Sequence, residues 1–581
     1  MNAFVPLHIH TAFEIGQSLV PVEELIEQAR RIGFPALAIT GRHCMFGVPL
    51  FEKLCRKQGI QPVLGCEIDI VRQESAVTGR LILLAETQQG YFNLVALSSQ
   101  LHAESKECGI TWEQLSAHKS GLIAVSPLVM QRYGGKWRDE LEQVFDPEDL
   151  FYEVAFGKNE QDLPDDLRKR AVPGHAVRYL LPAEETLFRR LCTTFYDDEI
   201  AGAHLPTPQE VSAWQERFPA AVANSLRIAR RCQATSLLDF GEADWPEFAG
   251  IEGKIAELRE TCRRQIRRLY LDRRAAAEER LELELQMARQ GGHLIQLAIM
   301  AELSEFVRAE GIFLAPVRAE ETSGILFYLL GLSPVDPLKF ALPPPECLAD
   351  STSATFNIIL RLGFAGRMRL IQHLQQKYAG RVAWTKFSTT STPEETMRKA
   401  AMICGLEAEP TSAAKRLAKD SRTRRLLELA AQIHRLPARR FPYNNVLMLS
   451  PRPLAGLIPL DERNRRGQLT LQYSNQALQR QGFLSIHLWE NQATSTLEEC
   501  LLLIRANGKP LPDLGGIPLD SAQILAEADQ EASDGGLWRE SCIKEIIAKR
   551  WQEWIQAEYP DEYDLARQRI EEMGLRCHDG R

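Results

Sequence analysis

Short apolar runs alternate with helical patterns over the first 245 residues. The runs PLHIH, PALAIT, QPVLGCEIDIV, RLILLAE, GLIAVSP and LFYEVAF have the length and composition of buried strands. Between them, VEELIEQARRIG, PLFEKLCRKQG and YFNLVALSSQLH place apolar residues at helical spacing. This alternation predicts an α/β domain with mainly parallel strands, because a helix is the usual crossover between parallel strands.

The first predicted strand ends in the sequence His-x-His. His8 and His10 are two residues apart, and alternate residues of a strand share one face. Two imidazoles on one face, at the mouth of a β/α barrel, suggest metal ligands.

A charged helical stretch follows between Ile255 and Met287. Acidic residues at helical spacing can pair with its arginines, so we expect a solvated face bearing salt bridges rather than a DNA contact. The arginines are Arg263, Arg264, Arg267, Arg268, Arg273 and Arg274.

Composition narrows the class of protein. A length of 581 residues predicts three or four domains, and 45% hydrophobic with 25% charged residues is ordinary for a soluble globular protein. We find no membrane-spanning run and no signal sequence, and the twelve cysteines form no C-x-x-C, so we expect a cytoplasmic protein with reduced thiols. The net charge of -8 means that any surface for nucleic acid must be local.

The middle of the chain resembles the palm of bacterial C-family replicative polymerases, the DNA polymerase III alpha subunits. The resemblance rests on ERLELEL at 279–285, on Pro316, Arg318 and Ser323, and on LGLSPVDPL at 330–338. It implies a polymerase beta-like palm with an inserted helical thumb. The family's glycine-rich phosphate loop is replaced here by APVRAE at 315–320.

The same resemblance indicates that the catalytic carboxylates are lost. Where the family has metal-binding aspartates, this chain has Asn357, Ile359 and Arg361, and His487 stands in place of a third. Mg²⁺ needs hard oxygen ligands, so we do not expect Mg²⁺ at this palm and assign it no catalytic residue. The alternative is a diverged, working DNA-directed DNA polymerase whose site is displaced in register.

The N-terminal region resembles the PHP domain, a distorted seven-stranded β/α barrel that begins these subunits. LHIHT, ALAITGRHCMFG, GCE, GYFNLVALSS and AVRYL carry the resemblance, which makes His8, His10 and Glu67 the matching metal ligands. Other ligand positions are changed to Gly41, Arg42, Arg80, Ala176 and Arg178.

These changes argue against a three-metal site. A single Zn²⁺ or Mn²⁺ on the three remaining ligands is chemically reasonable, and no cofactor is otherwise required. His43 and His175, each one residue out of register, stay open as substitutes, as does a purely hydrogen-bonded remnant without metal.

A basic stretch follows in the region that resembles the thumb. Residues 411–445 hold nine Lys or Arg against two acidic residues, which suits contact with phosphates without sequence readout. The alternative is a solvated pair of helices. The predicted DNA-binding residues are Lys415, Arg416, Arg422, Arg424, Arg425, Arg439 and Arg440.

We therefore predict a PHP-like domain at 1–245, a first palm part at 246–400, a thumb at 401–474, a last palm part at 475–510 and a truncated start of the fingers at 511–581. The predicted protein is a catalytically inactive pseudo-polymerase, a scaffold for DNA or a partner protein in replication, repair or damage tolerance, away from membranes. The alternative to this scaffold, besides the diverged polymerase, is a residual metal-dependent PHP phosphoesterase or 3'-5' exonuclease.

Overall fold

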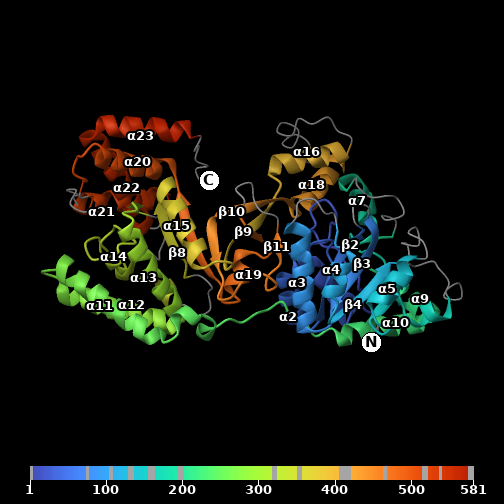
Figure 1. Ribbon diagram of the computed structural model, residues 1–581. Helices are drawn as coiled ribbons and strands as arrows, with labels where there is room; N and C mark the ends of the chain where they lie inside the picture. The colour runs from blue at the N-terminus through green and yellow to red at the C-terminus, as the bar shows by residue number, and fades with distance from the viewer. Residues whose placement is uncertain are drawn as a thin grey trace. The chain divides into compact units, whose positions relative to one another are not determined.

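The computed structural model describes residues 4–72, 77–103, 109–127, 136–154, 164–192, 202–316, 323–349, 356–404, 421–461, 468–512, 514, 521–535 and 539–573. The chain divides into two compact units (Figure 1). The first unit comprises Met1–Leu238, Trp384–Tyr443 and Leu454–Ala477. The second comprises Asp239–Ala383, Asn444–Pro453 and Leu478–Arg581.

A curled mixed sheet of six strands forms the centre of the first unit, in the order β1-β2-β3-β4-β5-β6. Its strands are β1 (Ala36–Ile39), β2 (Gln61–Val71), β3 (Val77–Ala85), β4 (Leu122–Pro127), β5 (Leu150–Val154) and β6 (Ala171–Pro173). Helices of this unit are α1 (Val22–Ile32), α2 (Val48–Lys57), α3 (Gln88–Ala103), α4 (Trp112–Ala117), α5 (Lys136–Val144), α6 (Asp165–Lys169), α7 (Glu185–Leu191), α9 (Pro208–Arg217) and α10 (Pro219–Arg231).

The sheet is less parallel than the sequence pattern predicts. β1-β2, β4-β5 and β5-β6 are parallel, but β3 runs antiparallel to both β2 and β4. The reason is the connection from β2 to β3. Only a few residues join these strands, and a connection that short reverses the chain, whereas a parallel pair needs a crossover of a dozen residues or more.

The chain before α1 is held by hydrogen bonds on both sides. Ile9 accepts from the backbone N–H of Thr40, just beyond β1, at 2.9 Å, and His10 donates to the carbonyl of Val177 at 2.9 Å. Apolar side chains of the sheet, including Val63, Ile82 and Phe151, pack with residues of α10 in one core. The backbone that carries His8 and His10 is therefore fixed against the sheet.

The first unit also contains two helices and several strands from later in the chain. These are β9 (Val382–Thr390, from Trp384 onward), α16 (Pro393–Ile403), α18 (Ser421–His434), the first part of β10 (Pro437–Leu449), β11 (Leu460–Asp461) and β12 (Thr470–Leu471). α16 begins at a capping box in which Thr392 and Glu395 satisfy each other's backbone N–H groups. The two helices pack through Ala400, Ala401, Leu426, Ala430 and Ile433.

The second unit combines helices with a small sheet in which β10, β13, β8 and β7 are successive neighbours. Its strands are β7 (Leu314–Ala315), β8 (Ile358–Leu362) and β13 (Leu484–Glu490), with the last residues of β10. Its helices are α11 (Ile251–Leu269), α12 (Arg274–Gly291), α13 (Leu294–Ala309), α14 (Ile325–Leu329), α15 (Phe364–Lys377), α20 (Gln492–Ala506), α21 (Ser521–Gly535), α22 (Arg539–Glu558) and α23 (Pro560–Glu572). α19 (Asn475–Gln479) lies at the boundary of the two units.

The charged stretch of residues 255–287 folds as two helices, α11 and α12. The break falls at Tyr270, whose buried hydroxyl donates to Asp336 at 2.6 Å. Ion pairs link the two helices at Arg263 and Glu282 (3.0 Å) and lie within them at Arg274 and Glu278 (2.8 Å). The predicted face with salt bridges is confirmed.

None of the described helices combines the length and the apolar character needed to cross a bilayer. Among the described residues, no two of the ten cysteines form a disulfide with each other.

Candidate functional site

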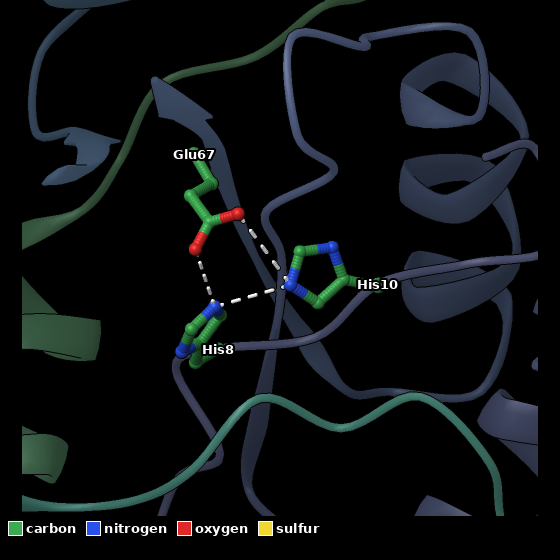
Figure 2. A group of neighbouring side chains, drawn as sticks. All are labelled: His8, His10 and Glu67. Carbon is green, nitrogen blue, oxygen red and sulfur yellow. Dashed lines mark hydrogen bonds and ion pairs between the residues drawn. The ribbon is translucent and has the colours of Figure 1, made fainter. Parts of the chain in front are cut away.

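Three side chains meet on the sheet of the first unit. The imidazoles of His8 and His10 and the carboxylate of Glu67, from the middle of β2, point toward one another (Figure 2). His8 Nε2 lies 3.2 Å from Glu67 Oε1, and His10 Nε2 lies 3.1 Å from His8 Nε2 and 3.8 Å from Glu67 Oε2. All three are buried, with exposed fractions of 4%, 0% and 1%. The structure thus brings together the three ligands that the sequence predicts.

A second layer of carboxylates orients both rings. His8 Nδ1 donates to Glu153 Oε2 at 3.0 Å, and His10 Nδ1 donates to Glu14 Oε2 at 2.8 Å. A ring that donates from Nδ1 to a carboxylate presents Nε2 to its other neighbour, and metal-binding histidines in proteins are held in this way. Both Nε2 atoms therefore face the position between the rings and Glu67.

The spacing of the three ligand atoms suits one cation. Ligands at about 2.0–2.2 Å from a tetrahedral Zn²⁺ lie roughly 3.3–3.6 Å from one another. Here the two Nε2 atoms lie 3.1 Å apart, Glu67 approaches His8 with Oε1 at 3.2 Å and His10 with Oε2 at 3.8 Å, and one ligand atom from each residue lies within 4.8 Å of the other two. The buried Glu67 Oε2 accepts no hydrogen bond from the residues that the structure describes. Two imidazoles and one carboxylate form a donor set that Zn²⁺ uses in proteins and that Mn²⁺ tolerates. The residues fit a single ion with one position left for water.

The electrostatics of the cluster favour a positive charge. Burial would lower the pKa of His8, but the carboxylates of Glu153 and Glu67 raise it to about 9. Burial likewise opposes ionisation of Glu67, yet its hydrogen bond from His8 and the charge of Arg80 hold its pKa well below the usual range. Burial and nearby Arg178 lower the pKa of His10. The cluster therefore holds a proton or a metal cation in a negatively charged setting.

Arginines surround this cluster where the PHP resemblance implies further ligands. Arg80 Nε lies 3.1 Å from Asp69 Oδ1 and 3.7 Å from Glu67 Oε2, and Arg42 also pairs with Asp69. Arg178 is 2% exposed and donates to the carbonyl of Gln17 at 3.1 Å. Guanidinium groups bind no cation. Arg42 and Arg80 therefore neutralise nearby carboxylates instead of sharing a metal with them.

The two histidines out of register lie outside the cluster. His43 Nε2 accepts the backbone N–H of Asp69 at 3.1 Å. His175 Nε2 donates to the carbonyl of His204 at 2.7 Å. Each ring is engaged elsewhere, and in the part of the chain that the structure describes neither joins the group of potential metal ligands.

A second set of predicted positions lies together on the sheet of the second unit. β8 and β13 are parallel, with Ile359 opposite His487 and Arg361 opposite Trp489. Residues two apart share a face of a strand, so Asn357 and Arg361 lie on the same side as Ile359. The structure therefore places Ile359, Arg361 and His487 on two adjacent strands, with Asn357 directly before β8.

The chemistry of this face is that of a packed sheet. Two donors reach Asn357 Oδ1: the Gln479 side chain at 2.7 Å and the Ser485 hydroxyl in a shorter contact. Ile359 is 7% exposed, and Arg361 lies 3.5 Å from Glu545 of α22. Within the described ranges, no group of three potential metal ligands occurs here; the only such group is the one on the first unit.

His487 is the titratable group of this face. Its Nε2 atom is buried and makes no hydrogen bond with any residue that the structure describes. Burial lowers the pKa of His487 to about 4, so the ring is neutral at physiological pH. The side chain as a whole is partly exposed, and it lies opposite Ile359 of the neighbouring strand.

Two residues of the ERLELEL motif support the start of a helix in the second unit. Glu284, from the ERLELEL motif, is fully buried and accepts the backbone N–H groups of Ile325 (2.9 Å) and Leu326 (3.1 Å) at the start of α14. Arg280 pairs with the same carboxylate at 2.7 Å. A carboxylate at a helix N-terminus satisfies donors that the helix leaves free. These motif residues position helices rather than substrates.

The predicted DNA-binding residues have different environments. Arg424 and Arg425 are exposed at the start of α18, and Arg439 is exposed but lies 2.9 Å from Glu395. Arg440 is partly buried, stacks on Phe46 with its guanidinium 3.4 Å from the ring centre, and donates to the Phe13 carbonyl. Lys415 and Arg416 lie outside the described residues, as does the side chain of Arg422.

Three carboxylates of the first site were missed in the sequence. Asp69 follows Glu67 at the alternate position of β2, which is a readable signal for a shared face. Glu153 is an acidic residue inside the otherwise apolar run LFYEV. Glu14 lies four residues after His10 with no distinctive pattern around it. A charge at a buried strand position is the signal that could have identified the first two.

Two family models match the chain. The model for the PHP domain matches residues 6–149. The model described as bacterial DNA polymerase III alpha NTPase domain matches residues 256–488. The two matches cover the regions that hold the two sites described above.

Curated relatives extend this similarity along most of the chain. The DNA polymerase III subunit alpha of Bacillus subtilis is 24% identical over 94% of this chain and 54% of its own length. The protein of the same name from Halalkalibacterium halodurans is 26% identical over 65% of this chain and 36% of its own length. The chain thus spans at most about half the length of these relatives.

A search of solved structures finds a weaker likeness. An amidohydrolase from Chromobacterium violaceum, with bound sulfate and no metal, is 11% identical and covers 37% of this chain and 96% of its own. The TM-score is 0.20.

Proposed function

This chain is a DNA polymerase III alpha-like protein with a PHP domain, and from that premise we propose that it no longer transfers nucleotides and serves as a scaffold for DNA or for a replication or repair protein. The observation that carries the proposal is the pairing of Ile359 with His487 on adjacent strands. Nucleotidyl transfer requires carboxylates that hold two Mg²⁺ ions beside the attacking and leaving oxygens. An aliphatic side chain and a neutral, partly buried imidazole lie at the positions where the family resemblance implies such carboxylates.

The two flanking positions support the same proposal. Asn357 is held by Gln479 and Ser485, and Arg361 brings a positive charge paired with Glu545. A guanidinium repels Mg²⁺, and an amide oxygen alone is a weak ligand. A cation would need several carboxylates at this face to offset these groups.

Primer extension tests the loss of synthesis. We expect no incorporation above background on a primed template with Mg²⁺ or Mn²⁺ at saturating nucleotide. Extension that is abolished by the His487→Leu change would overturn the assignment of this face.

The scaffold part of the proposal concerns DNA binding by exposed arginines of the first unit. Over residues 384–404 and 424–443, eight Lys or Arg accompany three Glu, whereas the whole chain has a net charge of -8. Such a local excess suits the phosphate backbone, which is bound without reading sequence. Arg424 and Arg425 are the best candidates because both are exposed and sit together at the start of α18.

Salt dependence gives the matching experiment. Neutralising both residues (Arg424→Gln with Arg425→Gln) should weaken DNA binding and lower the slope of log affinity against log salt by about 1 for each lost phosphate contact. The control is the exposed pair Arg30 and Arg31 at the end of α1, changed to Gln in the same way. Equal slopes for both double variants would refute the assignment to α18.

A second candidate function is a metal-dependent PHP phosphoesterase or exonuclease. It is favoured by the convergence of His8, His10 and Glu67 with two supporting carboxylates. A bound Zn²⁺ or Mn²⁺ would supply Lewis acidity and a more acidic water molecule. The chain's own residues would hold the ion, orient both rings and supply two nearby guanidinium groups, those of Arg80 and Arg178.

Metal content and hydrolysis separate this candidate from the scaffold. An enzyme would retain stoichiometric metal and hydrolyse a phosphodiester, and both properties would disappear in the His8→Ala variant. If the protein binds metal but does not hydrolyse the phosphodiester, the cluster is a structural metal site. A protein that binds no metal would retain the cluster as a hydrogen-bonded network.

The finer architecture is part of the same proposal. We assign the first unit's sheet to a seven-stranded PHP barrel, supported by the hydrogen bonds of residues 6–10 to β1 and Val177. We assign the sheet of the second unit to a palm, and α16 with α18 to a thumb. We also propose the domain limits that were predicted from the sequence. Limited proteolysis with mass spectrometry would test those limits.

A further inference from the structure

Three exposed aromatic rings lie together on β9 and β10 of the first unit. Phe387 is 42% exposed, Phe441 41% and Tyr443 38%. The Phe387 ring centre lies 6.0 Å from that of Phe441 and 5.4 Å from that of Tyr443. Among the described residues, only Trp489 is a comparably exposed aromatic side chain, so most of the exposed aromatic surface is gathered at one place.

Strand geometry explains the grouping. Phe441 and Tyr443 are two apart on β10 and share a face with Arg439, while Phe387 reaches them from the neighbouring strand β9. The exposed part of β10 contrasts with its last residues, Val446–Leu449, which are buried. Exposed aromatic groups on a strand are costly unless a partner covers them, which points to a binding surface.

Positive charge lies next to the rings. Arg439 is 62% exposed on the same face of β10, and its partner Glu395 is itself 31% exposed. Solvent-exposed ion pairs contribute little, so a phosphate can compete for this guanidinium. Arg440 points to the opposite face of β10, where it stacks on Phe46, so its guanidinium is not available to bind a phosphate beside the rings.

We propose that Phe387, Phe441 and Tyr443, with Arg439, form a stacking platform for single-stranded DNA. The inference rests on the proposed DNA binding and specifies its ligand. Every base has a flat face that stacks on an aromatic ring, so such a platform binds unpaired bases with little sequence preference while a nearby cation holds the backbone. In duplex DNA the base faces are already stacked inside the helix, so a duplex can use only the arginines.

The experiment compares three labelled ligands by fluorescence anisotropy with the full chain: oligo(dT) of about 16 nucleotides, an abasic strand of the same length, and a duplex. Phe441→Leu and Tyr443→Leu each remove a ring while keeping apolar volume. Leu427→Ala is the control, since Leu427 is 44% exposed in α18 of the same unit and makes no part of the platform. Tyr443→Phe keeps the ring and should behave as wild type.

The platform predicts that each Leu variant binds oligo(dT) about 5- to 50-fold more weakly, with abasic and duplex binding unchanged. Thermal unfolding should be unaffected because both rings are exposed. Unchanged oligo(dT) affinity in both Leu variants, or an equal loss for the abasic strand, would overturn the platform. If either result is found while salt-dependent binding through Arg424 and Arg425 persists, the proposed DNA binding stands without the aromatic platform. Absence of binding to all three ligands by the wild type would overturn both.

Discussion

The cluster on the first unit and the sheet face of the second unit differ in the chemistry of their side chains. At the first, the Nε2 atoms of His8 and His10 lie 3.1 Å apart, the carboxylate of Glu67 lies 3.2 Å from the first ring and 3.8 Å from the second, and Glu153 and Glu14 hold the rings. At the second, Ile359 pairs with His487, but no converging carboxylates accompany them among the described residues.

The difference shows that backbone register and site chemistry are separable. β8 and β13 keep their pairing because it depends on backbone hydrogen bonds and on alternating burial. That pairing tolerates any side chain that packs, including Ile359. The histidine cluster is buried, so its charges need specific partners, which Glu153 supplies for His8 and Glu14 supplies for His10.

The largest expected effect comes from restoring a carboxylate to the sheet face. Ile359→Asp would bury a charge where a 7% exposed aliphatic group now packs, and we expect about 3 kcal/mol of destabilisation in denaturant unfolding. Ile359→Val is the control and should cost about 1 kcal/mol. An Asp variant as stable as the Val variant, or one stabilised by Mg²⁺, would mean that this face still accommodates a cation.

The second largest effect is expected at the carboxylates that accept hydrogen bonds from the Nδ1 atoms of His8 and His10. Removing the negative charge with Glu153→Gln should lower Zn²⁺ affinity about 10- to 100-fold, because the neutral amide is a weaker acceptor for His8 Nδ1–H and no longer adds negative charge behind the ring. Competition with a chromophoric chelator would measure it. Glu148→Gln, at an exposed position nearby, is the matched control. Equal affinities for the two variants would remove Glu153 from the site.

The third effect is a pH dependence at the second face. The folded pKa of His487 is lowered to about 4, below the ordinary value of 6.5, so the unfolded chain binds a proton there first as pH falls. Its contribution to stability is therefore full above pH 6.5 and is lost progressively as pH falls toward 4.

His487→Leu should abolish that loss, which amounts to roughly 2 kcal/mol after allowing for partial solvent access of the ring. Unfolding free energies at about pH 7 and about pH 5 would measure it. His434→Leu, at an exposed position of α18, should leave the acid dependence as it is. Identical acid dependence in wild type and His487→Leu would contradict the burial argument.

The smallest effect is expected at Asn357. Asn357→Asp places a carboxylate beside two donors already present, Gln479 and Ser485, so stability should change by less than about 1 kcal/mol. The variant should gain no Mg²⁺ affinity in calorimetry, because a single carboxylate supplies too few oxygen ligands for the ion. Comparing the stabilities of the Asn357→Asp and Ile359→Asp variants distinguishes the hydrogen-bonded edge of this sheet face from its packed centre.

Much of the first site could be read from the sequence. The His-x-His spacing predicted two imidazoles on one face of a strand; the structure gives this segment only an isolated bridge from Ile9 to Val177 but still brings the rings together. Glu67 followed from the family resemblance, and Glu153 had a signal as a charge inside an apolar run, whereas Glu14 became recognisable only in three dimensions. Sequence proximity is informative over a few residues; Glu153 lies 145 residues from His8, and only the sheet brings them into contact. The aromatic platform is a similar case, since Phe387 and Phe441 come from separate segments.

By itself the sequence predicted a DNA polymerase III alpha-like protein and an alternation of strands and helices, and it placed Asn357, Ile359, Arg361 and His487 where the family resemblance implies carboxylates. The tertiary structure alone decided that His43 and His175 stay outside the cluster, that Arg440 packs on Phe46 instead of facing solvent, and that β3 runs antiparallel. The reason is that residue types and short spacings are local properties, whereas burial, ion pairing and strand direction depend on contacts between segments far apart in the chain.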